Sequence, residues 1–360
     1  MKVLQIIDSL DPGGAERMAI NYANLLHKNN IESHICVTRK EGILMEEIDL
    51  KVFYVFLDKK NTFDIKAILR LRNYIEKHRI DILHAHGTSY FLGTLIKIFY
   101  PSVKLIWHDH YGNSEFLNER KTPILKFCSN FFNGVISVNT KLKVWSQQNL
   151  HCKNVIKVNN FITLNSESSI GLKLKGNTSA FKIICVANLR PQKDHENLLN
   201  AFEILASKYN MTLHLIGNDP HTTYSKKLLE KINKTSFKDK IFYYGSQKNV
   251  QEFLVQCDLG VLSSISEGLP LAVLEYGVSG LAVISTNVGQ CEEVIMGNGK
   301  LVSPRDSNML AKEILFYYEN EHERILDSKK LKSHILSNFS EKLIGSEIIG
   351  FYSKVIKDRN

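Results

Sequence analysis

The sequence contains no pair of cysteines with the C-x-x-C spacing, although it holds six cysteines in 360 residues. Their other spacings do not match a metal-ligand pattern either, which argues against a zinc ribbon or a disulfide framework. Several, including Cys36, Cys185 and Cys257, lie inside apolar runs, where a free thiol acts as a small core side chain. This use of cysteine is typical of a reducing compartment.

Long apolar segments are also missing. No run approaches the roughly 20 residues that a transmembrane helix needs. The apolar run within residues 1–8 is too short for the core of a secretory signal peptide. We therefore expect a cytoplasmic protein, or one that binds peripherally to the inner face of the plasma membrane.

The G-x-G-x-x-G fingerprint of dinucleotide-binding domains is absent as well. Gly13-Gly14 lies between a predicted strand at 3–7 and a predicted helix at 15–26. No acid follows at the distance where a dinucleotide ribose is bound, which counts against a nicotinamide-dependent dehydrogenase. A Gly-Gly turn lets a ligand approach the backbone closely because no Cβ intrudes, but a purely structural turn explains it equally well.

Composition and charge fit a folded chain with an uneven charge distribution. Hydrophobic residues make up 44% and charged residues 23%, which are ordinary globular values, and the length suits two domains with a core each. Residues 1–165 hold 22 Lys and Arg against 15 Asp and Glu, so most of the net charge of +9 lies there. This bias suits contact with anionic lipid or an anionic substrate, although a lysine-rich surface alone would also produce it.

Strand and helix patterns alternate along both halves, separated by a Ser-, Gly- and Asn-rich segment at 163–179. Strands are predicted at 3–7, 33–38, 52–57, 80–87, 103–107, 135–138, 155–158, 181–186, 212–216, 241–244, 259–262 and 281–285. Helices are predicted at 15–26, 63–78, 118–133, 196–208, 225–233, 250–256 and 336–357. Repeated βα units indicate an α/β fold with two Rossmann-like parallel-sheet domains facing each other across a cleft. We expect these domains at 1–165 and 166–340, with a terminal helix at 341–360 that packs back on the first.

The most informative stretch, residues 263–275, follows the predicted strand 259–262. Pro270 is well placed to begin a helix, because the missing N–H is not needed in the first turn. Glu267 lies in the loop before it, and Glu275 lies more than one turn inside the helix. A continuous helix would place their Cα atoms about 12 Å apart, whereas the two carboxyls of a retaining glycosidase lie about 5–5.5 Å apart. The two acids therefore fit two separate diols better, as at the two ends of a sugar nucleotide.

Polar loops are predicted at the carboxyl ends of other strands, where open α/β sheets bind ligands. Arg190 and Lys193 follow the strand at 181–186 and would neutralise a diphosphate, although chance basic residues in a solvated loop remain the alternative. The predicted strand 80–87 ends in His84 and His86, and the strand at 103–107 leads into a loop with His108 and His110, so we expect these side chains on one rim of the sheet. We interpret these histidines as a polar substrate lining rather than metal ligands, because no further ligand set is evident.

The predicted helix at 118–133 combines basic residues, including Arg120 and Lys126, with apolar and aromatic ones. A helix of this kind can lie on an anionic membrane surface. Aromatic side chains that simply face the domain core are the alternative.

Taken in order, these motifs resemble those of the retaining GT-B glycosyltransferases of family GT4, along nearly the whole chain. The most specific element is Glu267-Gly268-Leu269-Pro270, with Glu275 completing an E-x7-E motif. Flanking elements agree in order and spacing, namely Gly13-Gly14, 81–86, His110, Asn160, 189–193, Gly217, Gly245, Gly280, Val288-Gly289 and Glu293. The resemblance implies the two-domain GT-B fold, a UDP- or GDP-linked sugar as donor, and neither a cofactor nor a metal.

The resemblance also implies roles for the matching positions. Glu267 would hold the hydroxyls of the donor sugar, Glu275 the ribose diol and Lys193 the diphosphate. Gly13-Gly14 would let the diphosphate and the acceptor approach the first domain, and His110, or else His108, would lie near the reacting carbon. The implied catalytic residues are thus Glu267, His110 and Lys193. The other donor-side positions are Gly13, Gly14, Asn188, Arg190, Gly217, Gly268, Leu269, Pro270 and Glu275, and the acceptor-side positions are His84, His86 and His108.

Two positions depart from the family pattern. Many members carry Arg where this chain has Asn188, which leaves the offset Arg190 as the other candidate for that phosphate contact. Gln290 replaces the frequent second glycine of the Val-Gly-Gly turn.

The family transfers sugar with retained anomeric configuration, and the departing phosphate helps to deprotonate the acceptor. The chain is therefore predicted to be a glycosyltransferase acting on a saccharide or lipid-linked saccharide, as in the synthesis of bacterial capsule, exopolysaccharide or lipopolysaccharide. A sugar-nucleotide epimerase of the same fold and a non-catalytic nucleotide-sugar-binding protein are the alternatives. The expected partners are the donor, the acceptor and an anionic membrane, but no nucleic acid.

Overall fold

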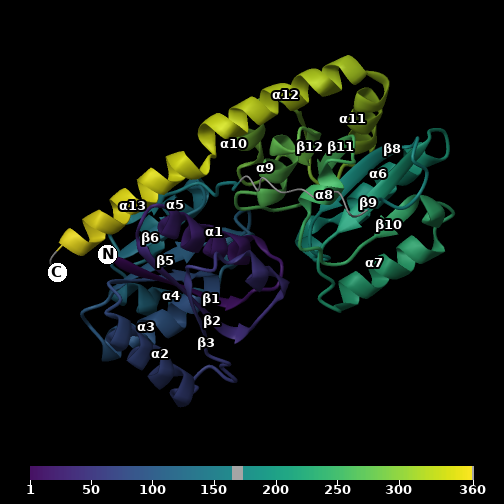
Figure 1. Cartoon of the computed structure of the whole chain (residues 1–360). Coiled ribbons are helices and arrows are strands. Elements are labelled where there is room, and N and C mark those ends of the chain that lie inside the picture. The colour runs from purple at the N-terminus through teal and green to yellow at the C-terminus, as the bar shows by residue number, and fades with distance from the viewer. Residues whose placement is uncertain (164–172, 359–360) are drawn as a thin grey trace. The chain divides into compact units, whose positions relative to one another are not determined.

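The computed structural model describes residues 1–163 and 173–358, so the middle of the predicted linker lies outside the described residues. The chain divides into two compact units, Met1–Thr163 with Glu341–Asn360, and Leu164–Ser340. Each unit is built on one parallel sheet with helices on its faces (Figure 1). This confirms the α/β prediction with two Rossmann-like domains.

The first unit has a seven-stranded sheet in the order β3-β2-β1-β4-β5-β6-β7. The strands are β1 (Lys2–Ser9), β2 (Glu32–Lys40), β3 (Phe53–Phe56), β4 (Ile82–His86), β5 (Lys104–Asp109), β6 (Gly134–Ser137) and β7 (Val155–Lys157). The order reverses between β1 and β4, because the chain first adds strands on one side of β1 and then on the other. The carboxyl ends of strands at such a reversal form the usual ligand site of an open α/β sheet.

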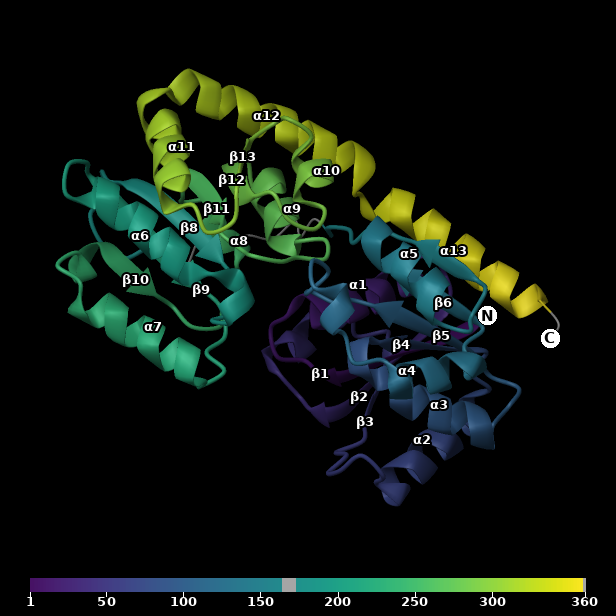
Figure 2. The same cartoon turned by 180° about the vertical axis from the view of Figure 1, so that it is seen from behind.

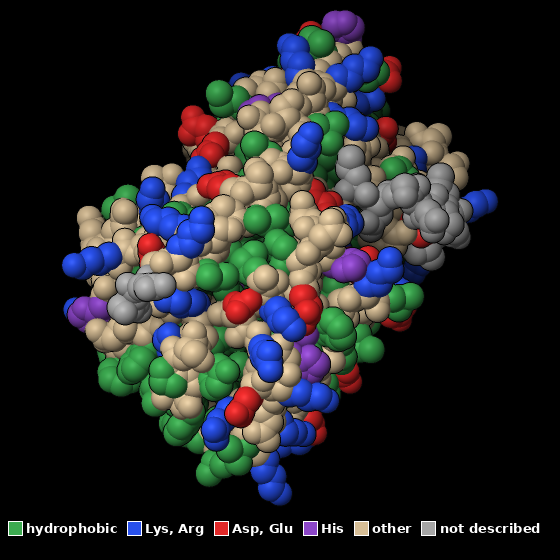
Figure 3. All heavy atoms as spheres, turned by 60° about the vertical axis from the view of Figure 1, so that its left-hand side comes forward, with side chains coloured by type: hydrophobic (Ala, Val, Ile, Leu, Met, Phe, Trp, Pro, Cys, Tyr) green, Lys and Arg blue, Asp and Glu red, His purple; other side chains and the backbone are tan. Residues whose placement is uncertain are grey.

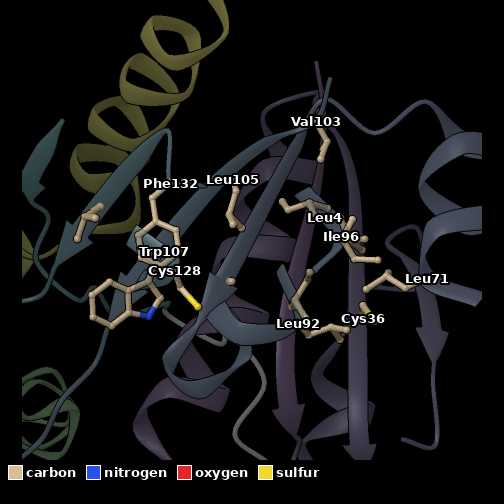
Figure 4. Packing of buried hydrophobic residues seen from close by; sticks show 14 of the residues in the cluster. Leu4, Cys36, Leu71, Leu92, Ile96, Val103, Leu105, Trp107, Cys128 and Phe132 are labelled. Atoms are coloured by element: carbon tan, nitrogen blue, oxygen red, sulfur yellow. The ribbon is translucent and has the colours of Figure 1, made fainter. Parts of the chain in front are cut away.

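Helices cover both faces of this sheet. They are α1 (Gly14–Lys28), α2 (Ile65–His78), α3 (Tyr90–Phe99), α4 (Pro123–Cys128), α5 (Thr140–Asn149) and α13 (Glu341–Lys357), with short 3-10 turns at Ile43–Glu47, Gly87–Ser89, Leu117–Glu119 and Ser129–Phe131. On one face, α2, α3 and α4 pack against an apolar core that includes Leu105 and Trp107 of β5 (Figure 4). The other face carries α1 and α13, which pack so closely that a Cβ at Gly345 would lie 3.1 Å from the Leu25 side chain.

The second unit has a six-stranded sheet in the order β10-β9-β8-β11-β12-β13 (Figure 2). The strands are β8 (Phe181–Val186), β9 (Met211–Ile216), β10 (Ile241–Tyr243), β11 (Leu259–Leu262), β12 (Ala282–Thr286) and β13 (Lys300–Val302). The helices are α6 (His195–Ala206), α7 (Thr223–Lys234), α8 (Gln251–Leu254), α9 (Leu271–Val278), α10 (Cys291–Ile295), α11 (Ser307–Glu319) and α12 (Glu321–Asn338), with 3-10 turns at Pro191–Lys193 and Lys238–Lys240. Here the order reverses between β8 and β11.

The predicted continuous helix at 118–133 is wrong. Only α4 is helical over more than one turn, flanked by the 3-10 turns Leu117–Glu119 and Ser129–Phe131. Pro123 begins α4, because its ring and missing N–H do not fit a helix interior. The terminal helical region also begins earlier than predicted, at Glu321 rather than at residue 336. Within residues 1–163 and 173–358, no helix is both long and apolar enough to cross a bilayer.

Candidate functional site

An ion pair between a half-buried lysine and a buried acid joins the loops that follow β8 and β11 in the second unit. Lys193 Nζ lies 2.5 Å from Glu267 Oε1, and Ser264 Oγ donates to the same oxygen over 2.6 Å. The side chain of Glu267 is 6% exposed and that of Lys193 is 22% exposed. These two predicted site residues therefore meet at the reversal in strand order, where a cation and an acid can contact one ligand.

Hydrogen bonds hold these two loops together as one support. Ser263 Oγ donates to the carbonyl oxygens of Lys193 and Asp194, at 3.1 and 3.0 Å. The Ile265 N–H donates to the Gln192 carbonyl over 2.8 Å. The position of Lys193 relative to Glu267 is thus fixed by backbone contacts as well as by the ion pair.

The loop at Glu267 and Gly268 also rests on the turn after β12. Gly289 has a φ of +57°, and a Cβ there would collide with the carbonyl oxygens of Glu267 and Gly268. The Gln290 N–H donates to the Gly268 carbonyl over 3.1 Å, and the Gln290 amide donates to Glu293 over 2.6 Å. Gly289 is therefore required both by its backbone conformation and by space.

The segment after Gly268 leads into α9 as predicted. Pro270 is the N-cap residue in an extended conformation, and the helix begins at Leu271. Leu269 and Pro270 are buried, whereas Glu275 lies in the second turn of α9 and is half-buried. Because α9 is a rigid element, the position of Glu275 suits a side chain that orients a ligand.

Asn188 and Gly217 shape the loop after β8. The Asn218 N–H donates to Asn188 Oδ1 over 2.8 Å, and a Cβ at Gly217 would collide with the Ala187 carbonyl. The Asn188 side chain thus ties two neighbouring loops together. Arg190 is exposed, and no described residue forms a hydrogen bond or ion pair with its guanidinium. The choice of Arg190 as the phosphate-binding arginine stays a prediction.

In the first unit, Gly13 and Gly14 lie at the carboxyl end of β1. Gly13 is the N-cap of α1 with extended backbone, and Gly14, the first helical residue, is exposed. The Glu16 carboxylate lies at this helix N-terminus, because a Cβ at Gly13 would collide with Glu16 Oε2. Sequence reasoning missed the neighbouring Asp8, which accepts hydrogen bonds from Thr38 Oγ1 over 2.6 Å and Thr88 Oγ1 over 2.5 Å. A lone acid at the end of an apolar strand was the available signal.

The prediction that the four histidines line one rim of the sheet was wrong for three of them. His84 and His86 lie within β4, inside the predicted strand 80–87, and β5 continues past the predicted end at residue 107 to include His108. All three are fully buried. Their sequence neighbours Leu83, Ala85 and Trp107 belong to the apolar core on one face of the sheet. The histidines therefore lie on the other face, where all three contact Tyr22 of α1 and His84 also contacts Tyr352 of α13. They therefore form an inner layer of the unit rather than an exposed acceptor-side lining.

These histidines are joined by hydrogen bonds and ring stacking. His84 Nε2 lies 3.1 Å from His108 Nδ1, and their rings are nearly parallel at 6°. His84 Nδ1 lies 2.6 Å from the Tyr352 hydroxyl, and His86 Nε2 lies 2.7 Å from Gln5 Oε1. Burial lowers the pKa of His84, His86 and His108 well below the usual range. All three are neutral near pH 7.

The same cluster has the composition of a metal site, the alternative that the sequence analysis set aside. One nitrogen from each of His84, His86 and His108 lies within 4.8 Å of the others. The nitrogen–nitrogen contact between His84 and His108 is a hydrogen bond, however, and one nitrogen of such a pair must carry the proton. A proton between these lone pairs competes directly with a metal ion. We interpret the cluster as a hydrogen-bonded core.

His110 follows β5 and is only half-buried. Its Nε2 lies 2.9 Å from His86 Nδ1, and its ring stacks on that of His108 with 4.0 Å between centroids. Burial lowers the pKa of His110 to about 3. At pH 7 it is therefore a neutral imidazole with one donor and one acceptor nitrogen.

The loop after His110 is held by a buried ion pair that sequence reasoning missed. Arg120 forms two hydrogen bonds to Asp109, at 2.7 and 2.8 Å. Its guanidinium also lies over the rings of Tyr111 and Trp145, 4.4 and 4.3 Å from their centroids. Arg120 was grouped with the membrane-facing basic residues, but its side chain is only 9% exposed. Its planar group suits bidentate pairing and stacking at once.

Comparison with known proteins finds a glycosyltransferase family in each half of the chain. Residues 12–165 match the family described as Glycosyltransferase Family 4, and residues 173–332 match the family described as Glycosyl transferases group 1. The capsular polysaccharide biosynthesis glycosyltransferase CapH of Staphylococcus aureus is 27% identical, over 82% of this chain and 83% of its own. The O-antigen biosynthesis glycosyltransferase WbnH of Escherichia coli is 24% identical, over 89% of this chain and 92% of its own.

A solved structure has the same fold. The crystal structure of Anabaena Alr3699/HepE in complex with UDP and glucose has a TM-score of 0.82 with this chain, at 18% identity. The likeness covers 98% of this chain and 99% of that one.

Proposed function

Since this chain belongs to the family-4 glycosyltransferases and has the GT-B fold, we propose that it transfers a sugar, with retained anomeric configuration, from a nucleotide-linked donor to a saccharide or lipid-linked saccharide. The observation that carries this proposal is the contact between Lys193 and Glu267 at the strand-order reversal of the second unit. UDP or GDP is the nucleotide, and the names of the relatives support a place in capsule or O-antigen synthesis.

In this proposal, the second unit binds the donor. Lys193 and the exposed Arg190 contact the diphosphate, and the carboxylate of Glu267 accepts hydrogen bonds from hydroxyls of the sugar. Glu275 on α9 accepts from the ribose diol. Fixed positive charge beside the diphosphate stabilises it as the bond to the sugar breaks, because the leaving group then gains negative charge.

The reaction itself breaks the bond between the anomeric carbon and the phosphate oxygen. The acceptor hydroxyl forms the new bond on the same side of the sugar, and its proton passes to the departing phosphate. Gly13 and Gly14 of the first unit lie close to the diphosphate in this scheme, and His110 contacts the sugar. We propose that no metal takes part, because Lys193 and Arg190 supply the positive charge.

We also propose a cytoplasmic location with peripheral contact to an anionic membrane. The outer sides of α3 and α4 carry exposed apolar residues, with Phe99, Ile124 and Phe127 each 61% exposed. Exposed Lys121 and Lys126 lie beside them in sequence. Figure 3 shows hydrophobic side chains gathered on the surface with Lys and Arg among them. Apolar residues flanked by lysines favour an anionic bilayer surface.

The experiment that tests the function measures donor binding and turnover with a panel of nucleotide sugars. Glu275→Ala is expected to weaken donor binding, and Glu267→Ala chiefly to lower turnover. Glu292→Ala, which changes an exposed acid of α10, is the matched control. Conversion of a nucleotide sugar without any acceptor would indicate the epimerase alternative. Unchanged kinetics in both site variants would contradict the proposal.

A further inference from the structure

Lys59 is the only lysine or arginine that is buried as a whole residue among residues 1–163 and 173–358, with 7% of its surface exposed. It follows β3 in the first unit, where its backbone N–H donates to the Thr38 carbonyl over 2.7 Å. Within the described ranges, no group forms a hydrogen bond or an ion pair with its ammonium. An unpaired charge that is largely removed from water is costly, so this ammonium indicates a binding partner from outside the chain.

Two arginines are anchored around the same turn. Arg70 of α2 donates from Nη2 to the carbonyl of Leu57, two residues before Lys59. Arg39 follows Thr38 in β2, and its Nε lies 4.0 Å from Asp8 Oδ1. Both arginines are exposed. Cations from β2, from the loop after β3 and from α2 are thus attached to neighbouring backbone at the carboxyl edge of the sheet.

The acids near Lys59 are held by other groups. Asp64 caps α2 and accepts from two backbone N–H groups, at 3.0 Å each. Asp8 accepts from the hydroxyls of Thr38, Thr88 and Ser89. Burial lowers the pKa of Lys59 and the charge of Arg39 lowers it further, whereas Asp8 and Asp64 oppose this shift without cancelling it. The protein therefore compensates the ammonium only in part.

An oxyanion fits the three cations in charge and in hydrogen-bonding capacity. An ammonium offers three donors to oxygen atoms, and a guanidinium can donate to two phosphate oxygens at once. The excess of Lys and Arg over Asp and Glu in residues 1–165 favours the approach of an anion to this unit. A lysine that merely extends its head group into water would expose more than 7% of its surface.

We propose that Lys59, together with Arg39 and Arg70, binds a phosphate group of the acceptor. The acceptor is then a charged compound, either a soluble sugar phosphate or a saccharide joined to a lipid through phosphate, and not a neutral saccharide. This assignment to the acceptor rests on the proposed function, in which Lys193 of the second unit binds the donor diphosphate. Binding of phosphate at Lys59 can be measured without any turnover.

The test is titration calorimetry of the full-length protein at low ionic strength with glucose 1-phosphate and methyl glucoside, a pair that differs in the phosphate group. We expect only glucose 1-phosphate to bind. Lys59→Met keeps the apolar stem and removes the charge, so it should weaken this binding about tenfold or more, the effect of one lost charged hydrogen bond. Lys60→Met is the matched control, because Lys60 is exposed and already paired with Asp58.

Arg39→Gln should also weaken the binding of glucose 1-phosphate, and this variant changes an exposed residue rather than a buried one. The proposal is overturned if the wild type does not distinguish the two probes at millimolar concentration. It is equally overturned if Lys59→Met and Arg39→Gln both bind glucose 1-phosphate like the wild type. Farnesyl diphosphate and farnesol repeat the comparison for a lipid, and tighter binding of this diphosphate than of glucose 1-phosphate would identify the lipid-linked acceptor.

Titration with UDP separates this site from the donor site. Lys59→Met should bind UDP like the wild type, and Lys193→Met should bind glucose 1-phosphate like the wild type. Loss of UDP affinity in Lys59→Met would assign the ammonium to the donor and overturn the proposal. If the wild type binds glucose 1-phosphate through Lys59 but binds no nucleotide, the proposed function fails and the phosphate site at Lys59 stands.

Discussion

The ammonium of Lys193 and the carboxylate of Glu267 neutralise each other across two loops, with 2.5 Å between Nζ and Oε1. A diphosphate that binds at this edge of the sheet would draw Lys193 toward itself, and Glu267 would then be available to hydroxyl groups. The same pair thus keeps a nearly buried acid compensated before the donor binds and provides two contacts afterwards.

Lys193→Met is expected to weaken binding of UDP or GDP by about 10- to 100-fold, the effect of one lost charged hydrogen bond. Titration calorimetry with the free nucleotide measures it directly. Lys208→Met, an exposed lysine on the same unit, is the control for general loss of charge. Equal nucleotide affinity in Lys193→Met and wild type would remove Lys193 from the diphosphate site.

Gly289→Ala is expected to abolish most of the activity, because a Cβ at this position collides with the carbonyl oxygens of Glu267 and Gly268. Gly297 is a matched control, since it also has positive φ (+74°) but faces open space. Gly297→Ala should cost about 1 kcal/mol of stability through backbone strain alone and keep its kinetics. If both variants lose activity equally, strain rather than contact with the Glu267 loop is responsible.

Arg120→Met should destabilise the first unit by about 3–5 kcal/mol, because it leaves the buried carboxylate of Asp109 without a cation. The double variant Asp109→Asn, Arg120→Met removes the uncompensated charge and should recover part of this loss. Urea unfolding followed by tryptophan fluorescence measures both. A double variant no more stable than Arg120→Met would show that the lost packing on Tyr111 and Trp145 dominates.

The two-sheet architecture could be predicted because buried parallel strands are short apolar runs between turns. The predicted placement of His84, His86 and His108 on an open rim failed, because all three are buried on a face of the sheet that helices cover. Their cover includes Tyr352, which is 268 residues from His84 in sequence. A local pattern holds no information about a partner at that distance. Gln5 was overlooked for the same reason, since the His86 ring that its Oε1 contacts lies on another strand.

The two charged residues of the second-unit site could be predicted from the sequence, but the contacts that support them could not. Lys193 and Glu267 belong to local motifs at the ends of two strands, and parallel strands bring their carboxyl ends to one edge. The support beneath them was not predictable, because Ser263 and Gly289 act by contacts with backbone atoms of other loops. Arg120 was assigned to the surface because its charge was counted without the acid and the aromatic rings that enclose it.

The buried histidines make stability depend on pH in a defined window. Burial lowers the pKa of His84, His86 and His108 in the folded protein, whereas in the unfolded chain it returns to about 6.5. Below that pH the unfolded state binds more protons than the folded state, so stability falls as the pH falls. Between pH 6.5 and 5.5 each such histidine costs about 1 kcal/mol, and His110, whose pKa burial lowers to about 3, brings the total for the four to about 4 kcal/mol.

This loss can be measured selectively for the first unit. The chain has two tryptophans, Trp107 and Trp145, and both belong to that unit. We expect urea midpoints from tryptophan fluorescence to be constant from pH 8 to 7 and to fall steeply from pH 6.5 to 5.5. The carboxylates whose pKa is lowered, such as Glu32 and Asp64, destabilise the fold only at lower pH, near their ordinary values of about 4. His151→Gln, at an exposed position of the same unit, should leave the profile unchanged. A flat profile down to pH 5.5 would mean that the histidine cluster takes up protons while folded, which its enclosure by Tyr22 and Tyr352 argues against.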